Sequence, residues 1–368
     1  MKIILACGGT GGHIFPAFSV AEEIKRRYPN ASLIYVYGKK DIESAIFSIV
    51  SQEKRISIES APFRGSASLL NPVFLLKLFQ GCWKSIVLLF KEKPDLVAGF
   101  GGHYSFPVIM AAWILRVPAV IHEQNVVPGK ANRILARFVK KIALSFPETE
   151  KYFSVQNNFQ VTGNPIRSSI ERDCRKEALD FFKFKADKLT LLVLGGSQGA
   201  ESINILFLEA LRFLNDAIKQ KIQILHLCGK MSPITAQEVF DQAQVDGQAF
   251  SFFERMDLAY GAADFVIGRA GATFLAEAKA KNIPAILIPY PFADSHQIQN
   301  AKAFCLEVEG VIKEQARLTG EELARTMEEW LSKFDKNHRG GPRHEFNTNR
   351  LPNARVRLAN CMLEMIAQ

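Results

Sequence analysis

The chain has 368 residues, and its 46 lysines and arginines against 37 aspartates and glutamates give a formal charge of +9. Hydrophobic residues make up 48% and charged residues 23%, which excludes a largely disordered protein, while the length predicts two domains rather than one small core. The excess of basic residues indicates an anionic partner: nucleic acid, an acidic membrane surface or a phosphorylated ligand.

The six cysteines are far apart at irregular spacings, and none forms a C-x-x-C pair. We therefore expect no zinc site, no disulfide framework and a reducing compartment. The apolar run at the N-terminus is too short for a signal peptide. These features predict a cytosolic protein.

The first half of the chain alternates apolar strands, Gly-rich turns and helices. We predict strands at 2–7, 32–37, 96–99 and 119–122, and helices at 17–27 and from Gly101-Gly102 through residue 111. The same unit restarts at mid-chain, with strands at 189–194, 222–227, 265–267 and 285–288 and a helix at 202–214. This order predicts two Rossmann-like α/β domains with parallel sheets and right-handed crossovers.

The two predicted domains join near Gly163-Asn164-Pro165, where the first runs out of strands. We place the N-terminal domain at 1–162 and the C-terminal domain at 163–349. A basic stretch, 336–357, leads into a last helix within 350–368, which we expect to pack back toward the N-terminal domain.

Three Gly-rich turns follow predicted strands, at Gly8–Gly12, Gly101-Gly102 and Gly195–Gly199. Backbone N–H groups in such turns, together with a helix N-terminus, favour a phosphate group. For any single turn it is equally plausible that the glycines merely permit a tight bend. The dinucleotide fingerprint, the Walker pattern and Asp-x-Asp are all absent, which disfavours the usual NAD and ATP sites and a carboxylate-bound Mg²⁺.

The second half carries a fuller candidate site. Thr273 and Glu277 are four residues apart on a helix that begins near Arg269–Ala272, so they share a face. A carboxylate there can accept hydrogen bonds from a ribose diol while the helix N-terminus faces a diphosphate. The amide-rich segment 291–300 suits sugar hydroxyls. A solvated Glu277 and a solvated loop are the alternatives.

Several motifs occur together in one order: Gly8-Gly9-Thr10-Gly11-Gly12-His13, His122-Glu123-Gln124-Asn125, Gly163-Asn164-Pro165-Ile166-Arg167, Gly195-Gly196-Ser197-Gln198-Gly199 and Arg269-Ala270-Gly271-Ala272. With them the chain resembles, over nearly its whole length, the MurG family of bacterial transferases. The resemblance implies a GT-B fold, in which two Rossmann-like domains face each other across a cleft. It also implies inverting transfer of N-acetylglucosamine from UDP-N-acetylglucosamine to the 4-hydroxyl of the N-acetylmuramoyl unit of lipid I.

The resemblance further implies the site residues and the setting. Phe253 would lie against the uracil, Glu277 would meet the ribose, Asn125 and Gln297 the sugar, and Ser197 and Arg167 the diphosphate. The remaining implied donor contacts are Thr10, Gly11, Gly12, Ala272, Thr273, Phe274, Leu275 and Ala276. No metal, cofactor or nucleic acid is expected. The implied setting is peptidoglycan synthesis for cell shape and division, at the cytoplasmic face of the inner membrane, with other cell-wall synthesis proteins as further partners.

Three features depart from the family's pattern. His103 stands where an aromatic phenol or Phe is usual, and Phe274 replaces a small hydroxyl residue beside the ribose. The loop 336–350 is longer and more basic than usual.

The acceptor hydroxyl needs a general base, and we predict His13, with Glu123 as the reserve. Equally open is that His13 only orients the loop or the sugar. Two rival functions share the architecture: a UDP-N-acetylglucosamine 2-epimerase-like enzyme, and a non-catalytic nucleotide-sugar-binding membrane subunit.

The most lipophilic stretch, 69–90, is interrupted by Asn71, Lys77, Gln80 and Lys84, so we expect it not to span a membrane. Leu75, Phe79 and Trp83 share a helix face flanked by lysines, and we predict that Leu75, Phe79, Trp83, Lys77 and Lys84 dock on anionic lipids. A core helix packed on the sheet is the alternative.

Overall fold

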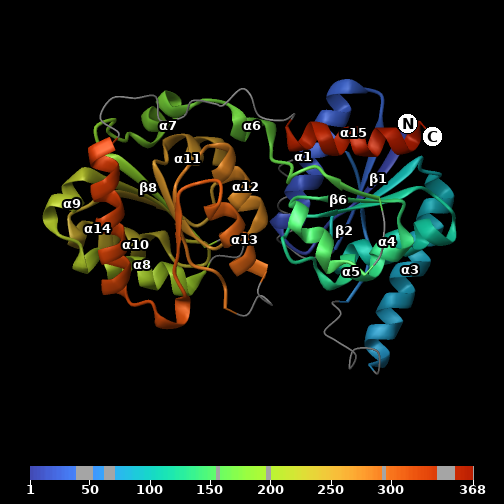
Figure 1. The fold of residues 1–368 in the computed structure, drawn as a ribbon, viewed down its shortest axis with the longest axis horizontal. Helices are drawn as coiled ribbons and strands as arrows, with labels where there is room; N and C mark the ends of the chain where they lie inside the picture. Colours follow the sequence, from blue (N-terminus) through green and yellow to red (C-terminus); the bar gives the residue numbers. More distant parts are fainter. Residues whose placement is uncertain are drawn as a thin grey trace. The chain divides into compact units, whose positions relative to one another are not determined.

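The computed structural model describes residues 1–38, 53–61, 71–154, 158–195, 200–291, 296–337 and 353–367. The chain divides into two units, Met1–Ser168 with Arg350–Gln368, and Ser169–Asn349. Each has its own parallel sheet (Figure 1). The expected fold class, two α/β domains with parallel sheets, is therefore confirmed.

The sheet of the first unit has seven strands in the order β3-β2-β1-β4-β5-β6-β7, all paired in parallel. The strands are β1 (Lys2–Ala6), β2 (Ser32–Tyr37), β3 (Lys54–Ser57), β4 (Leu96–Gly99), β5 (Ala119–Glu123), β6 (Lys141–Leu144) and β7 (Asn158–Val161). The order reverses between β1 and β4, and the Gly-rich turns at Gly8 and Gly101 follow these two strands. Ligands of open α/β sheets bind at such a switch point.

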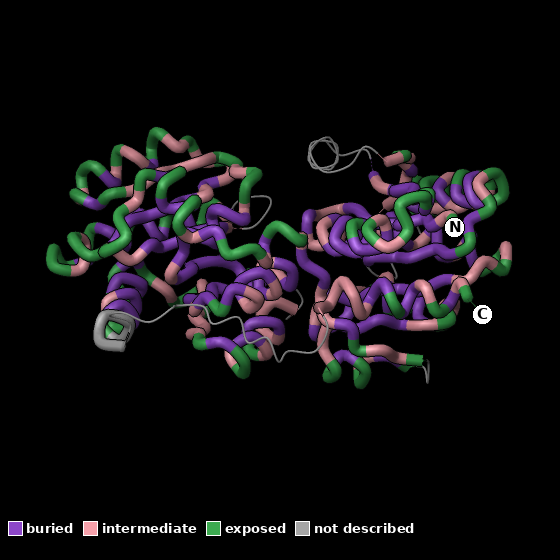
Figure 2. The backbone as a smooth tube through the Cα atoms, turned by 90° about the horizontal axis from the view of Figure 1, so that it is seen from above, coloured by how far each residue is buried: buried purple, intermediate pink, exposed green. Residues whose placement is uncertain are grey.

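Helices cover both faces of this sheet. They are α1 (Gly11–Arg27), α3 (Pro72–Glu92), α4 (Gly102–Ile114), α5 (Lys130–Leu135) and α15 (Ala354–Ile366), with 3-10 turns η2 (Ala136–Phe138) and η3 (Pro147–Tyr152). Because side chains alternate along a strand, Ile3 and Leu5 pack with α1 and α15, whereas Ile4 and Ala6 pack with α3 and α4. Figure 2 shows the buried strands between these layers.

The first helix begins at Gly11, earlier than the predicted residue 17. The amides of His13 and Ile14 both donate to the Thr10 carbonyl, so the first helical turn already contains Gly11 and Gly12. His13 therefore lies in the first helical turn and not in a loop, and its position is fixed by regular backbone geometry.

The predicted boundary after residue 162 differs from the structure, in which the first unit extends to Ser168. The Gly163 carbonyl accepts a hydrogen bond from His122 Nε2, and the Arg167 guanidinium lies 4.4 Å from the centre of the Phe15 ring. Gly163 has φ of +77°, and a Cβ there would stand 2.9 Å from Arg357 Nη2 of α15. These contacts tie residues 163–168 to β5, α1 and α15.

The second unit has a six-stranded parallel sheet in the order β10-β9-β8-β11-β12-β13. Its strands are β8 (Leu189–Leu194), β9 (Ile222–Leu227), β10 (Asp246–Phe250), β11 (Phe265–Gly268), β12 (Ala285–Leu287) and β13 (Gly310–Ile312). The helices are α6 (Ser168–Glu171), α7 (Arg175–Phe182), α8 (Glu201–Phe213), α9 (Asp216–Lys221), α10 (Pro233–Ala243), α11 (Met256–Ala262), α12 (Ala272–Ala280), α13 (His296–Cys305) and α14 (Gly320–Asn337), with η4 (Gln315–Arg317).

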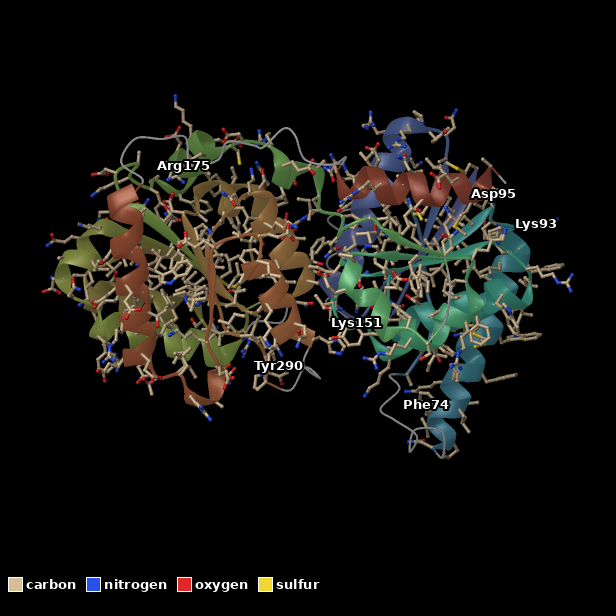
Figure 3. The ribbon with its side chains drawn as sticks, in the orientation of Figure 1. Phe74, Lys93, Asp95, Lys151, Arg175 and Tyr290 are labelled. Carbon is tan, nitrogen blue, oxygen red and sulfur yellow. The ribbon has the colours of Figure 1, made fainter. Side chains whose placement is uncertain are left out.

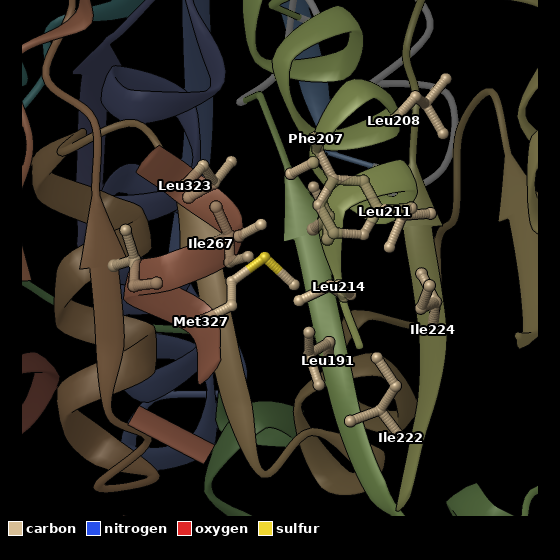
Figure 4. Packing of buried hydrophobic residues seen from close by; sticks show 14 of the residues in the cluster. Leu191, Phe207, Leu208, Leu211, Leu214, Ile222, Ile224, Ile267, Leu323 and Met327 are labelled. Atoms are coloured by element: carbon tan, nitrogen blue, oxygen red, sulfur yellow. The ribbon is translucent and has the colours of Figure 1, made fainter. Parts of the chain in front are cut away.

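The core of this unit lies between the sheet and the helices α8 and α14 (Figure 4). Leu191 and Ile267 of neighbouring strands pack against Phe207 of α8 and Met327 of α14. This packing holds β8 and β11 in register, and the carboxyl ends of these strands carry the turns at Gly195 and Arg269.

Candidate functional site

In the first unit, the loop after β1 leads into the N-terminus of α1. Thr10 is the N-cap residue, Gly11 and Gly12 are the first two helical residues, and the first turn holds no acidic side chain. Such a helix end favours an anion. The structure therefore brings the predicted contacts Thr10, Gly11 and Gly12 together at one helix N-terminus.

His13 lies at the same helix end and contacts the loops after β4 and β5. Its Nδ1 is 3.1 Å from Gln124 Oε1. Gly101 and Gly102 have φ of +88° and +72°, and a Cβ on Gly101 would stand 3.1 Å from the imidazole. Only glycine combines this backbone conformation with such close approach of a ring.

Glu123, the reserve base, is buried at the end of β5. Its Oε1 accepts from the Asn125 amide at 2.9 Å and from Asn125 Nδ2 at 3.1 Å, and its Oε2 accepts from the Gly129 amide at 3.0 Å and from Asn132 Nδ2 at 2.8 Å. A carboxylate with four donors organises the loop after β5. This geometry favours a positioning role for Glu123, with Asn125 as the residue that it orients.

In the second unit, Glu277 lies in α12 and is only 5% exposed, so the solvated alternative is wrong. The Tyr260 hydroxyl of α11 donates to Glu277 Oε2 at 2.9 Å. Ala272, Thr273 and Leu275 are also buried, whereas Phe274 and Ala276 are partly exposed. The N-cap of α12 is Gly271, where a Cβ would meet no atom within 4 Å.

Arg269 and Gln297 connect the turns around that helix N-terminus. Arg269 donates from Nη1 to the Ile288 carbonyl at 3.0 Å and from Nη2 to Ser202 Oγ at 2.9 Å, and burial lowers its pKa. Gln297 Oε1 accepts from the Tyr290 amide at 2.9 Å and from the Ala270 amide at 3.3 Å. Tyr290, labelled in Figure 3, follows β12. Both side chains thus order the carboxyl ends of β11 and β12.

Phe253, the predicted uracil contact, is half-buried in an aromatic cluster. Its ring centre is 5.1 Å from that of Phe250 and 5.3 Å from that of Phe182. The cluster holds the partly exposed Phe253 ring in place after β10. His103, the departure in the first unit, packs against Tyr104 with the ring centres 4.0 Å apart and the ring planes tilted by 38°.

Some predicted features lie outside the described residues: Ser197 and the basic loop at 338–350. Within the described residues, no group of three or more His, Cys, Asp and Glu side chains could hold a metal ion.

Tyr260 and Gln124 were not predicted as functional side chains. The signal for Tyr260 was a phenol within the mostly apolar run 258–263, because a buried hydroxyl needs a partner.

Models of one protein family match most of the chain. Residues 3–144 match the N-terminal domain of glycosyltransferase family 28, and residues 190–353 match its C-terminal domain. The chain belongs to glycosyltransferase family 28.

Curated relatives in this family are similar over nine-tenths of the chain. A protein of Halothermothrix orenii is 38% identical over 344 residues, which is 90% of this chain and 91% of that protein. One of Desulfitobacterium hafniense is 37% identical over 358 residues, 91% and 92% of the two chains. Both are named UDP-N-acetylglucosamine--N-acetylmuramyl-(pentapeptide) pyrophosphoryl-undecaprenol N-acetylglucosamine transferase.

Solved structures agree with the family. MurG of Acinetobacter baumannii is 26% identical, with a TM-score of 0.71 over 99% of this chain and 100% of that one. The expected membership of the MurG family is confirmed. A UDP-GlcNAc 2-epimerase of Neisseria meningitidis has a TM-score of 0.63 over 100% of both chains at 11% identity, a likeness of fold alone.

The helix α3 forms a second candidate surface. Among the described residues it is the helix that has the length and apolar composition to cross a membrane. One face, with Phe74, Ser85 and Leu89, is buried, and the helix packs on α4. Figure 3 labels Phe74 and Lys93 at its two ends. The opposite face exposes Leu75, Leu76, Phe79, Trp83, Val87 and Phe90.

Lysines follow one flank of this exposed face. Lys77, Lys84 and Lys91 are seven residues apart, which places them along one side of the helix. All three are exposed, and Lys84 Nζ also lies 3.2 Å from Glu59 Oε1. One face of the helix therefore belongs to the core, and the other is apolar with a basic border, so docking on lipid stays a prediction.

Proposed function

We propose that this protein is the enzyme that transfers N-acetylglucosamine from UDP-N-acetylglucosamine to the 4-hydroxyl of the N-acetylmuramoyl unit of lipid I, with inversion, for peptidoglycan synthesis. The observation that carries the proposal is the 35–38% identity, over about nine-tenths of both chains, to relatives that bear this transferase name. The buried Tyr260–Glu277 pair, with Glu277 in the middle of α12, supports it independently.

The second unit is proposed to bind the donor. The N-terminus of α12 offers its dipole to the diphosphate, and Glu277 accepts hydrogen bonds from the ribose hydroxyls. Phe253 offers a ring face to the uracil. Because Gln297 Oε1 already accepts two backbone amides, Gln297 would contact the sugar as a donor through Nε2.

Negative charge develops on the diphosphate as UDP leaves. Helix N-termini and charged donors stabilise such charge when they are fixed before the reaction. We propose that the first turns of α1 and α12 do so, together with Arg167, whose guanidinium is held over the Phe15 ring. Ser197 remains a predicted diphosphate contact.

His13 is proposed as the general base. It takes the proton of the acceptor hydroxyl as that oxygen bonds to the anomeric carbon and the bond to the UDP oxygen breaks. Glu123 is assigned instead to positioning, because all four of its described contacts are donors that hold the loop carrying Asn125.

The exposed face of α3 is proposed to rest on anionic lipid, next to a lipid-linked acceptor. Apolar side chains on that face enter the interfacial region, and the lysine flank meets the anionic headgroups. The protein would thus be peripheral to the cytoplasmic side of the membrane.

An assay of acceptor dependence tests the function against its epimerase rival. We expect UDP release from UDP-N-acetylglucosamine only when a lipid I analogue is present. NMR of the donor incubated alone should show no change at C2 of the sugar. Epimerised donor in the absence of acceptor, without transfer in its presence, would replace the transferase by the rival.

A further inference from the structure

A line of hydrogen bonds connects His13 to the backbone at Gly163. His13 Nδ1 is 3.1 Å from Gln124 Oε1, Gln124 Nε2 is 3.0 Å from His122 Nδ1, and His122 Nε2 is 3.0 Å from the Gly163 carbonyl. His122 and Gln124 are each 1% exposed. The line therefore runs through the interior of the first unit and ends at a partly exposed imidazole.

The protonation state of His122 is determined by its partners. A carbonyl only accepts hydrogen bonds, so His122 Nε2 carries a proton and donates it to Gly163. Burial lowers the pKa of His122 to about 4, although the hydrogen bond to Gly163 opposes this, so the ring is neutral at neutral pH. A neutral imidazole with a proton on Nε2 has a bare Nδ1, which accepts the hydrogen bond from Gln124.

The orientation of the Gln124 amide is determined in the same way. Its Nε2 lies 2.9 Å from the Phe100 carbonyl and 3.2 Å from the His122 carbonyl, in addition to His122 Nδ1. All three of these atoms are acceptors, so the side-chain nitrogen of Gln124, and not its oxygen, must face them. The oxygen Oε1 then points to His13 and can only accept, which requires a proton on His13 Nδ1.

We propose that Gln124 and His122 are positioning residues that keep a proton on His13 Nδ1, so that the lone pair of Nε2 is the base for the acceptor hydroxyl. This assignment rests on the proposed function for its catalytic meaning, but the protonation pattern itself does not. It favours the base over the purely orienting role of His13, because a proton fixed on Nδ1 makes Nε2 the nitrogen that can accept another.

The proton and electron balance of the step is simple. Nε2 takes the hydroxyl proton, the hydroxyl oxygen forms its bond to the anomeric carbon, and the electron pair of the broken bond leaves with UDP. His13 becomes an imidazolium that still donates from Nδ1 to Gln124 Oε1, and the amide dipole stabilises the new charge. Gly101 and Gly102 let the loop after β4 approach the ring closely, which restricts its rotation.

Long-range ¹H–¹⁵N NMR of the histidine-labelled protein at neutral pH tests the assignment without any turnover. The seven histidines give few signals, and His13→Gln identifies those of His13. We expect a protonated Nδ1 and a bare Nε2 for His13, and the reverse for His122. A proton on His13 Nε2 in the unmodified protein would overturn the proposal.

Gln124→Met and Gln124→Glu form a matched pair, because both keep the side-chain length but only Glu offers an acceptor to Nδ1. We expect Gln124→Met to bring Nε2–H signal to His13 and to lower kcat at least about tenfold, with the KM for UDP-N-acetylglucosamine changed less than about twofold. Gln124→Glu should return the Nδ1–H form, with its carboxyl protonated on the oxygen that faces the three acceptors of the Gln124 amide nitrogen.

An unchanged His13 spectrum in Gln124→Met, or unchanged kcat despite a changed spectrum, would remove Gln124 from this role. Should Gln124→Met not fold, the Gln124→Glu spectrum decides, because an Nε2–H form there contradicts an acceptor-controlled His13. Absence of transfer by the unmodified protein, with the expected spectrum, would contradict the proposed function and leave the protonation pattern standing.

Discussion

The Tyr260 hydroxyl donates a hydrogen bond to Glu277 Oε2 across 2.9 Å, and both residues are buried between α11 and α12. The hydrogen bond restricts the orientation of the carboxylate, and a carboxylate has several lone pairs, so one group can accept from more than one donor. The pair thus orients the side chain that we assign to the ribose.

Replacing the carboxylate tests that assignment. Glu277→Ala should weaken UDP binding sharply, because two hydrogen bonds to a charged group are lost, each worth about 1.5–3 kcal/mol gross. Isothermal titration calorimetry with UDP measures the change. An affinity that stays within twofold of the unmodified protein would rule out the ribose contact.

Replacing only the phenol tests the orientation. Tyr260→Phe keeps the packing of α11 and removes one hydrogen bond, so UDP affinity should fall by roughly 3- to 30-fold, less than in Glu277→Ala. Tyr28→Phe, at an exposed tyrosine that follows α1, is the matched control and should leave affinity unchanged. Equal affinities for the two variants would show that Glu277 does not depend on Tyr260.

His13→Ala should lower kcat by about 10²–10⁴, because a general base acts in the transition state. The affinity for UDP-N-acetylglucosamine, measured by calorimetry, should stay near that of the unmodified protein. The opposite pattern, weakened donor binding with retained turnover, would make His13 a binding residue.

Exposed aromatic side chains on α3 should be needed for lipid binding. Phe79→Ser with Trp83→Ser should weaken sedimentation with anionic vesicles and leave UDP affinity unchanged, because both rings are more than half exposed. Phe213→Ser, at an exposed position of α8, is the control.

Added salt should also weaken this binding, since each lysine near an anionic surface contributes about 1 kcal/mol. Equal binding to neutral vesicles would remove the electrostatic part. Binding to neither kind of vesicle would leave α3 as a helix of the core.

Stability should depend on pH through the buried histidines. Burial lowers the pKa of His226 from its ordinary 6.5 to about 4, so the unfolded chain binds a proton first as the pH falls. The stabilisation that comes from the neutral His226 is fully present above pH 6.5 and is lost as the pH falls toward 4. The loss amounts to about 3 kcal/mol.

Urea unfolding of His226→Phe from pH 7 to pH 4 measures this effect. The ring packs against Phe207 and Phe240, and Phe keeps these aromatic contacts. Phe also loses the hydrogen bond between His226 Nε2 and Asn204 Oδ1 at 3.0 Å, so the test is the slope of stability with pH and not the stability itself. The free energy of unfolding should decline less steeply in the variant, with the rest of the decline retained through His122, whose pKa is also about 4. Identical slopes would exclude a contribution from His226.

The sequence predicted most of the central strands of both sheets and none of the edge strands. The four edge strands β3, β7, β10 and β13 were not predicted, nor was the short β6. Edge strands here are at most partly buried, so they lack the continuous apolar run that marks a central parallel strand. The helix start at Gly11 was missed because glycines carry no helix signal of their own.

For the candidate site, too, local sequence patterns predicted some residues, and contacts distant in sequence determined the others. Sequence motifs pointed to His13, Asn125 and Glu277 by residue type and spacing. The four hydrogen bonds that Glu123 accepts and the roles of Tyr260 and Gln124 depend instead on contacts between distant segments. Gln124 meets His13 across 111 positions of sequence. Such pairs follow from the strand order β1-β4-β5, which no local pattern contains. The cleft expected from the resemblance stays a prediction.

The central claim is the transfer of N-acetylglucosamine to the acceptor, and mass spectrometry of the product tests it most directly. The protein is incubated with UDP-N-acetylglucosamine and a lipid I analogue, with His13→Ala as the parallel sample. We predict an acceptor heavier by one N-acetylglucosamine residue, formed in step with UDP and strongly reduced in the variant. Release of UDP with an acceptor of unchanged mass would contradict the account.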